Sequence, residues 1–514
     1  MNKPSRFAAS AAGALAVFLV LSGCTTDDEA QTPSSSTTVT QPNVQGSVPA
    51  GFEKAYEQTV TWEKCSGAFE CATIQAPLDW NDPASETIDV AVQMYNARSG
   101  SPLGTVLINP GGPGGSGLEL VEYAPIIFGK DLLDNYNILG FDPRGVGKST
   151  PVSCYEPKDM DRYLALSFPT VTEKVLPVLQ KEADAYAQAC KENSGPILEF
   201  VDTQSVARDM DLMRALVGDE KLNYLGYSYG TELGAIYAGL FPDNVGRMVL
   251  DGALDLRISD FEKSKQQAVG FENALRAFVA DCQKGSECVL TGSVDDGMKQ
   301  VADFLDLLGT NPLPTDTDRV LTQSLGTYAV LQPLYAEALW KDLRAALEQA
   351  INAQDGTLLL ASADSYFDRE PDGTYASNKT EAFAAVHCLD PRGTSDFETM
   401  SKEAEQILAA APTMGKYFGF GGVACKNWPY PVAEQKYDLA AKGAAPIMVI
   451  GTTNDPATPY VWAEGLTEQL ESAFLVTHVG EGHTVYGTGD ACIQKTVDEF
   501  FVDGTIPKEG LRCE

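Results

Sequence analysis

A serine between two glycines, in Gly226-Tyr227-Ser228-Tyr229-Gly230, constrains the fold of this chain more than any other feature of its sequence. A run typical of a strand ends at Leu225, and a run typical of a helix, 231–240, follows it. Glycine permits the sharp turn that such a short connection needs. The hydroxyl then stands above the strand end, at a helix N-terminus that stabilises negative charge. The pattern predicts a nucleophilic Ser228, although a turn with a solvated serine would have the same sequence.

Strand-like and helix-like segments alternate on both sides of Ser228. Such alternation predicts an α/β fold, with a mostly parallel sheet and helices on both of its faces. Ligands on these sheets bind at the carboxyl ends of the strands. The strand-like runs are 88–95, 104–109, 136–141, 247–251, 445–451 and 473–479.

The alternation stops between Asp255 and Lys436, where amphipathic segments such as 298–308 and 335–351 appear instead. This mostly helical insertion falls between two strands of the predicted sheet. It is expected to cover the active-site edge as a lid, although a structural appendage would show the same pattern. The predicted organisation is a first core segment 51–254, a lid insertion 255–436 and a second core segment 437–514.

The N-terminus has the features of a bacterial lipoprotein signal. Lys3 and Arg6 precede the apolar run 8–21, which is short for a membrane span. The run ends at Leu21-Ser22-Gly23-Cys24, which resembles a lipobox, so a signal peptide 1–23 and lipidation of Cys24 are predicted; ordinary secretory cleavage is the alternative. Residues 24–50 are rich in Thr, Ser, Gln and Pro and are expected to form a disordered tether. The predicted location is the extracellular face of the cell membrane, through a lipid anchor.

Eleven cysteines leave ten for pairing once Cys24 is lipidated. Structural disulfides outside the cytoplasm are expected, although spacing alone does not determine the connectivity. Only three histidines are present and no C-x-x-C pair occurs, so no metal site is predicted. The suggested pairs are the sequence neighbours Cys65 with Cys71 and Cys282 with Cys288, and the longer loops Cys154 with Cys190, Cys388 with Cys425 and Cys492 with Cys513.

The formal net charge of −34 argues against nucleic acid as a binding partner, because an acidic surface repels phosphate backbones. The same acidity would attract cationic substrates, and it also serves solubility. The sequence defines no oligomeric state.

A serine nucleophile needs a histidine base, which a carboxylate orients. His483 follows the last predicted strand, whereas His478 lies within that strand and His387 lies in the insertion. Asp455 follows the strand-like run 445–451 and precedes a helix, although an Asp at this place can also be a simple helix cap. Ser228, Asp455 and His483 are therefore the predicted catalytic residues, in the chain order Ser, Asp, His.

The reaction also needs two backbone N–H donors for the oxyanion. Tyr229 is expected to supply the first, and the glycine-rich run 109–117 after a strand the second, from Gly111 or Gly112, of which Gly112 is the predicted donor. A phosphate-binding loop is the rival interpretation of this run. It lacks the Lys and Ser/Thr pair at the required spacing.

Together these motifs resemble the secreted tripeptidyl-aminopeptidase family, which is grouped with prolyl aminopeptidases in the α/β-hydrolase fold. The resemblance rests on 111–117, Asp142-Pro143-Arg144-Gly145, 226–231 and the Asp455 and His483 motifs, and it covers about 50–514, with a TAP-like C-terminal region. The lipobox and cysteines are most similar to the actinobacterial lipoproteins called carboxylesterase A. Prolyl aminopeptidases usually have His where this chain has Pro110.

The resemblance implies acidic groups that hold the substrate's amino terminus, and Asp390 and Glu232 are the candidates. Ordinary helix-face or surface charges are the alternative for both. An ion pair between Asp142 and Arg144 is expected to hold the oxyanion loop.

These observations predict a membrane-tethered extracellular serine hydrolase that cleaves peptides near the amino terminus without a cofactor. Its partners would be peptide or protein substrates. A carboxylesterase acting on envelope lipids or short acyl esters would use the same residues. The third alternative is a non-catalytic surface-binding lipoprotein.

Overall fold

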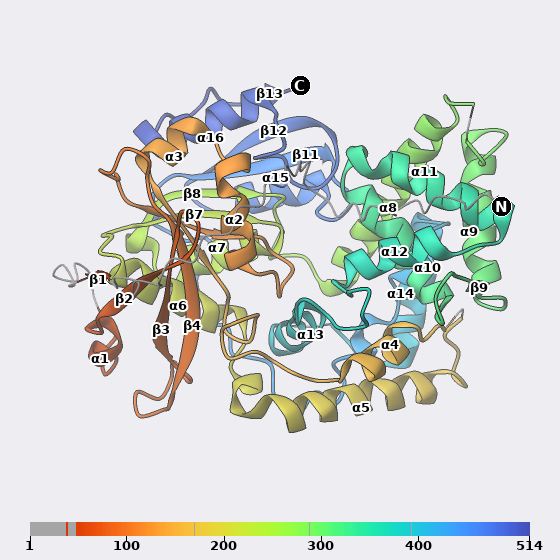
Figure 1. Ribbon diagram of the computed structural model, residues 1–514, viewed down its shortest axis with the longest axis horizontal. Coiled ribbons are helices and arrows are strands. Elements are labelled where there is room, and N and C mark those ends of the chain that lie inside the picture. The colour runs from red at the N-terminus through yellow and green to blue at the C-terminus, as the bar shows by residue number, and fades with distance from the viewer. Residues whose placement is uncertain (1–36, 40–47, 169, 287, 392) are drawn as a thin grey trace, which may run out of the picture. The chain divides into compact units, whose positions relative to one another are not determined.

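The computed structural model describes residues 37–39, 48–168, 170–286, 288–391 and 393–514 (Figure 1). The predicted signal peptide, Cys24 and most of the predicted tether lie outside these ranges. Within them, no helix combines the length and the apolar character that crossing a bilayer requires.

Eleven strands among the described residues form one sheet, in the order β1-β2-β3-β4-β6-β5-β7-β8-β11-β12-β13. The neighbouring pairs β1–β2, β2–β3, β3–β4 and β4–β6 are antiparallel. Every neighbouring pair from β6 to β13 is parallel, so the predicted α/β fold with a mostly parallel sheet is confirmed. The strands are β1 Thr37–Val39, β2 Val60–Ser66, β3 Phe69–Pro77, β4 Thr87–Tyr95, β5 Thr105–Asn109, β6 Asn137–Phe141, β7 Leu222–Tyr227, β8 Val245–Asp251, β11 Ile447–Asn454, β12 Ala473–Glu481 and β13 Arg512–Cys513.

The central strands are apolar along their whole length because helices cover both faces of the sheet. On β5, Val106 and Ile108 belong to one hydrophobic cluster and Leu107, between them, belongs to the other. The first cluster includes side chains of α2 (Gly117–Ile127), α3 (Lys130–Asn135) and α16 (Ala491–Asp503). The second includes side chains of α6 (Thr203–Leu216), α7 (Tyr229–Leu240) and α15 (Tyr460–Gln469), together with Tyr56 of the short α1 (Glu53–Tyr56).

A mostly helical segment with a hydrophobic core of its own lies between β8 and β11 (Figure 1). Two helices from before β7, α4 (Pro157–Leu164) and α5 (Leu176–Ser194), also pack against this segment: Arg369 binds Asp161 on α4, and Ala183 on α5 packs with Met400. The elements of the segment are α8 Asp260–Cys282, α9 Val294–Leu308, β9 Leu313–Pro314, β10 Val320–Leu321, α10 Gln323–Leu331, α11 Trp340–Glu348, α12 Thr357–Tyr366, α13 Lys379–Leu389 and α14 Phe397–Ala410.

Five disulfides cross-link the described residues, and each joins a pair of cysteines that the sequence suggested. Two of them close loops of six residues, and three span longer connections. Cys388 at the end of α13 is bonded to Cys425, and Cys492 on α16 is bonded to Cys513 on the edge strand β13. Such cross-links stabilise the folded chain mainly by restricting its unfolded state.

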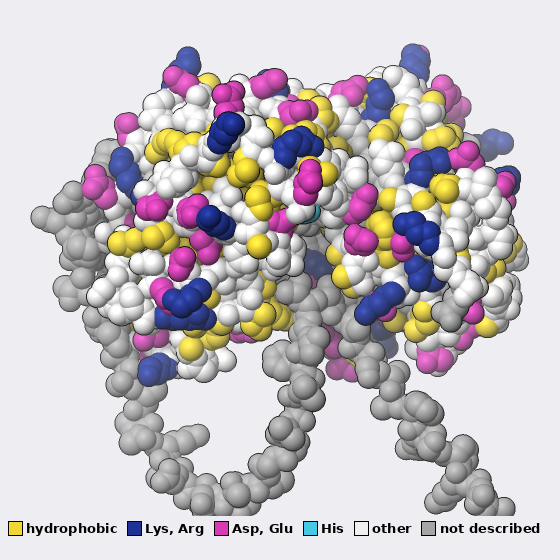
Figure 2. All heavy atoms as spheres, turned by 90° about the horizontal axis from the view of Figure 1, so that it is seen from above, with side chains coloured by type: hydrophobic (Ala, Val, Ile, Leu, Met, Phe, Trp, Pro, Cys, Tyr) yellow, Lys and Arg dark blue, Asp and Glu magenta, His cyan; other side chains and the backbone are white. Residues whose placement is uncertain are grey.

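Acidic side chains are spread over the face of the molecule shown in Figure 2, with Lys and Arg side chains among them. On this face the negative charge of the chain is distributed and does not form one continuous acidic patch.

The expected ion pair between Asp142 and Arg144 is wrong. Arg144 is fully buried and binds Asp209 on α6 with two hydrogen bonds of 2.7 Å. Asp142 accepts hydrogen bonds from Ser116, the N-cap of α2, and from the backbone N–H of Lys148. The two side chains leave the same turn toward helices on opposite faces of the sheet, so they cannot pair with each other.

Removing the Asp209 carboxylate should destabilise the protein strongly, because it would leave the Arg144 guanidinium buried without a counter-charge. We expect Asp209→Ala to lower the free energy of unfolding by about 3–5 kcal/mol, measured by denaturant titration. Arg162→Ala, which removes a partly exposed ion pair with Glu182, is the control and should cost less than about 1 kcal/mol. Equal losses in the two variants would contradict the assigned role of the buried pair.

Candidate active site

Ser228 lies in the turn between β7 and α7, in a backbone conformation that few residues other than glycine adopt. Its φ is 55° and its ψ is −123°. The backbone N–H of Ser228 donates to the Asp251 carbonyl on β8 at 2.9 Å, and the Thr231 hydroxyl donates to the Ser228 carbonyl at 2.6 Å. Such backbone strain is retained where the surrounding structure holds it, and it is common at functional sites.

The loops after β11 and β12 bring Asp455 and His483 together. The Nδ1 atom of His483 lies 3.0 and 2.9 Å from the two carboxylate oxygens of Asp455. Asp455 also accepts hydrogen bonds from the backbone N–H groups of Ala457 and Thr458 and from the Thr458 hydroxyl. Its side chain is fully buried and that of His483 is 9% exposed. The predicted cap-like turn is thus present, and the same carboxylate orients the histidine.

Two opposing effects determine the pKa of His483. Burial by itself lowers the pKa of the imidazole, because it disfavours the charged form. The charge of Asp455 and its hydrogen bond act in the opposite sense and prevail, so the pKa of His483 is raised above its ordinary value. A histidine in this state readily accepts a proton from a neighbouring hydroxyl.

His483 lies close to the end of β8, the strand next to β7, which leads into Ser228. A Cβ atom added to Gly252, which follows β8, would lie 3.1 Å from Cε1 of His483. Within the described ranges, no hydrogen bond joins the Ser228 hydroxyl to His483. In free enzymes this bond is often long and shortens only when substrate binds. The structure therefore brings all three predicted residues to one edge of the sheet and joins two of them directly.

The glycine-rich loop after β5 lies against the turn at Ser228. A Cβ at Gly111 would lie 2.4 Å from the Tyr227 carbonyl and 2.9 Å from the Ser228 Cβ, so only glycine fits. The Gly111 N–H already donates to the Asn109 side chain at 2.9 Å, which makes Gly112 the better oxyanion donor of the two. Tyr229 begins α7, where backbone N–H groups have no partner within the helix.

The helical segment makes direct contacts with the loops of the predicted triad. The carbonyl of Tyr335 accepts the backbone N–H of His483 at 2.8 Å, and the two rings meet edge to face at 5.4 Å. Gln267 on α8 donates to the carbonyl of Ala457, two residues after Asp455, at 2.7 Å. Local sequence carries no signal for these contacts, because the partners lie far apart in the chain.

Helix α13 is fastened to the core beside the oxyanion loop. The side chain of Asn378 donates to the carbonyls of Gly145 and Val152, both at 2.8 Å. The Glu381 carboxylate accepts the N–H groups of Cys154 and Tyr155. These bonds fasten the N-terminal part of α13 to the segment 145–155, which follows β6.

Asp390, at the C-terminal end of α13, lies near Glu232 on α7. Asp390 accepts hydrogen bonds from the N–H and the hydroxyl of Thr203, and that hydroxyl is 2.6 Å from the hydroxyl of Tyr229. Burial and then repulsion from Glu232 raise the pKa of Asp390 to about 8. Burial also raises the pKa of Glu232, which the charge of Lys263 partly offsets. The charges of both candidates for the amino-terminal site therefore interact, and Glu232 lies on the first turn of α7, four residues after Ser228.

The amino-acid sequence of this chain is similar to those of known proteins. Residues 411–513 match the family described as TAP-like protein. Serine protease Hip1 of Mycobacterium tuberculosis is 33% identical over 89% of this chain and 91% of its own length. The chain belongs to the TAP-like family of α/β-hydrolases. Carboxylesterase B of Mycobacterium tuberculosis is 36% identical and covers 86% of each chain, and tripeptidyl aminopeptidase of Streptomyces lividans is 28% identical over 90% of this chain and 87% of its own.

This TAP-like chain is a serine hydrolase, as its relatives are enzymes of that class. The alternative of a non-catalytic binding lipoprotein is therefore not retained. Peptidase and esterase names both occur among the relatives, so the class of substrate is a separate question.

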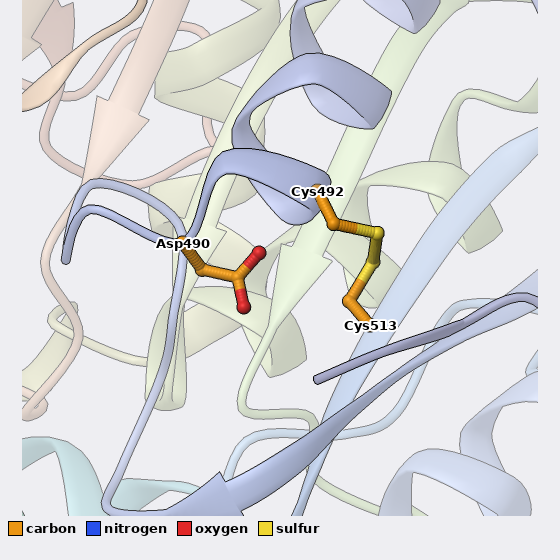
Figure 3. Close-up of side chains that lie close together, drawn as sticks. All are labelled: Asp490, Cys492 and Cys513. Carbon is orange, nitrogen blue, oxygen red and sulfur yellow. A yellow bond between two sulfur atoms is a disulfide. The ribbon is translucent and has the colours of Figure 1, made fainter.

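The two remaining histidines, His387 and His478, contact other residues. His387 is exposed on α13 and stacks on Phe383 at 6.0 Å, whereas His478 on β12 lies 3.0 Å from Asp490. Two sulfur atoms lie within 4.8 Å of the Asp490 carboxylate (Figure 3). Those sulfurs belong to the Cys492–Cys513 disulfide and offer no thiolate, so this group is not a thiolate metal site.

A methyl group at Gly111 should disrupt the reactivity of Ser228 without unfolding the protein. The added Cβ would collide with the Tyr227 carbonyl, and Gly111 has a φ of +92°. We expect Gly111→Ala to slow labelling of Ser228 by a fluorophosphonate about 100-fold or more, with unchanged circular dichroism. Gly100→Ala is the control, since Gly100 also has positive φ but no atom within 4 Å of its Cβ position. Labelling of Gly111→Ala at the normal rate would contradict this account of the loop.

Proposed function

We propose that this serine hydrolase cleaves short peptides from the free amino terminus of peptide or protein substrates. The observation that carries the proposal is the partly buried pair of interacting carboxyl groups, Asp390 and Glu232, near the turn at Ser228. An ammonium group between two mutually repelling carboxylates removes the repulsion and gains charge-assisted hydrogen bonds. The α-amino group of a peptide is the cation that matches this site.

The proposed chemistry is acyl transfer through Ser228. The Ser228 hydroxyl attacks the scissile carbonyl while His483 takes its proton, and Asp455 holds the imidazole in the required orientation. The N–H groups of Gly112 and Tyr229 bind the oxyanion of the tetrahedral intermediate. His483 then protonates the leaving amine, and water hydrolyses the acyl-enzyme by the same steps in reverse order. These steps use no cofactor.

The position of the carboxyl pair limits the length of the released fragment. Tyr229 adjoins Ser228, and its hydroxyl is linked to Asp390 through Thr203. One tyrosine side chain and two hydrogen bonds reach at most about 12 Å, the span of about three extended residues. Fragments of one to three residues therefore fit between the amino-terminal site and the nucleophile.

Ester hydrolysis is the second candidate function. A relative named carboxylesterase B is 36% identical over 86% of this chain, and the same triad serves esters and amides. Acyl groups of esters carry no ammonium, so the carboxyl pair would have no ligand in that reaction. The names of the protease and aminopeptidase relatives also favour the peptidase.

We further propose that the chain is secreted and tethered to the cell membrane by a lipid on Cys24, with 24–50 as the tether. Five disulfides support an oxidising compartment. The helical segment 255–436 is proposed to cover the site. The hydrogen bonds made by Tyr335 and Asn378 favour a segment that stays in place and does not open and close as a mobile lid.

The amino-terminal site is tested by blocking the substrate's amine. We expect free-amine peptide amides of one to three residues to be cleaved, and their acetylated forms to lose about 100-fold or more in kcat/KM. Asp390→Asn should reduce cleavage of the free-amine peptides and leave short acyl esters unaffected. Glu398→Gln, which neutralises an exposed carboxylate on α14, is the control. If acetylation has no effect, the aminopeptidase proposal fails; if only esters react, the enzyme is a carboxylesterase.

The affinity for free-amine substrates should depend on pH in a defined direction. Asp390, with a pKa of about 8, is mostly protonated at neutral pH and becomes a better partner for ammonium as it ionises. We expect KM to fall between pH 6 and about 8 and to rise again above it, where the α-amino group loses its own proton. Steady-state kinetics from pH 5.5 to 9.5 measure this, and Asp390→Asn should flatten the fall. A KM that rises steadily from pH 6 to 8 would contradict it.

A further inference from the structure

A second carboxylate, that of Asp251, lies beneath the proposed catalytic residues. Asp251 is the last residue of β8, and its side chain is fully buried. One oxygen, Oδ2, accepts the N–H of Val485 at 2.9 Å and the N–H of Tyr486 at 2.7 Å. These amides follow His483 by two and three residues, so the carboxylate holds the loop that carries the base. Two successive N–H groups form a concave site for an anion.

Asp251 also fixes the nucleophile through its backbone. Its carbonyl accepts the N–H of Ser228 at 2.9 Å, and in the sheet register it lies opposite Tyr227 on one side and Ile450 on the other. One residue therefore binds the turn at Ser228 with its main chain and the His483 loop with its side chain. Any shift between the two loops would break one of these bonds.

The second oxygen, Oδ1, is buried and has no hydrogen-bond partner among the described residues. A buried carboxylate with a free oxygen is costly unless a nearby positive charge compensates it. The titratable groups that face this region are His483 and Asp455 from their loops, Tyr227 from β7, and Tyr335, which packs on His483 from the helical segment. Only His483 among these four can become positive.

We propose that Asp251 is a positioning residue, which locks the His483 loop to the strand end beneath Ser228 and adds a second negative charge that favours the protonated form of His483. The inference rests on the proposed catalytic function. In the step where His483 takes the proton of Ser228, the imidazolium is stabilised directly by Asp455 and at longer range by Asp251. Burial raises the pKa of Asp251 to about 6, whereas the two loop amides and His483 act against that rise, so Asp251 is ionised at neutral pH.

The substitution Asp251→Asn removes the negative charge of this side chain and keeps its size and shape. The asparagine oxygen can still accept both loop amides, but the negative charge is gone. Without it the pKa of His483 falls, so the midpoint of the acid limb moves to lower pH by about one unit, and the plateau rate falls several-fold. The rate of labelling by a fluorophosphonate between pH 4.5 and 9 measures both quantities without any choice between peptide and ester.

Asp219→Asn is the matched control. Asp219 is a partly buried carboxylate, also with a pKa of about 6, that accepts a backbone N–H, from Thr105, at the opposite ends of β5 and β7. This variant should keep the wild-type midpoint and plateau, even if its melting temperature falls. A wild-type pH profile in Asp251→Asn would overturn the proposal and leave Asp251 a purely structural residue.

Two further measurements keep the outcomes distinct. If Asp251→Asn does not fold, hydrogen exchange of the unmodified protein replaces it: protection of the peptide 482–488, corrected for intrinsic rates, should fall as the pH drops through about 6. Protection that is constant from pH 5 to 8 would overturn the proposal. Labelling that persists in Ser228→Ala would instead refute the proposed function, which Asp251 by itself does not test.

Discussion

Three neighbouring parallel strands lead into the loops of the site, and the site depends on their register. Tyr227 on β7 lies opposite Asp251 on β8, which lies opposite Ile450 on β11. Ser228 and Gly252 directly follow β7 and β8, whereas β11 continues to Asn454 and is then followed by Asp455. Helices cover both faces of these strands, and a slip of one residue would turn every buried side chain to the wrong face. The core thereby supplies the rigidity that keeps Ser228 at a φ of 55°.

The helical segment between β8 and β11 belongs to the framework of the site as much as the sheet does. Tyr335 binds the backbone of His483, Gln267 binds the loop after Asp455, and Asn378 fastens α13 to the core. A segment with such contacts stabilises the loops that carry Asp455 and His483. The alignment of these two residues therefore depends on the packing of the helical segment.

Local patterns allowed most of the sheet and three of the site's loops to be predicted. Ser228, Asp455 and His483 each follow a strand-like run, and parallel strands of one sheet bring such positions to a common edge. The pair of Asp142 with Arg144 was predicted wrongly, because proximity in sequence does not reveal which face of the sheet a side chain reaches. Nothing in the sequence indicated a role for Asp251, because a polar residue at the end of a strand is common.

The sequence by itself determined the backbone features of this protein: the alternation of strands and helices, the turn at Ser228 and the glycine-rich loop. Each of these arises from conformational preferences of a few adjacent residues. Only the tertiary structure decided which distant groups meet, such as Asp251 with the amides after His483, and Asp390 with Glu232. Their hydrogen bonds and charges act over a few ångströms in space, and the separation of the partners along the chain does not encode that distance.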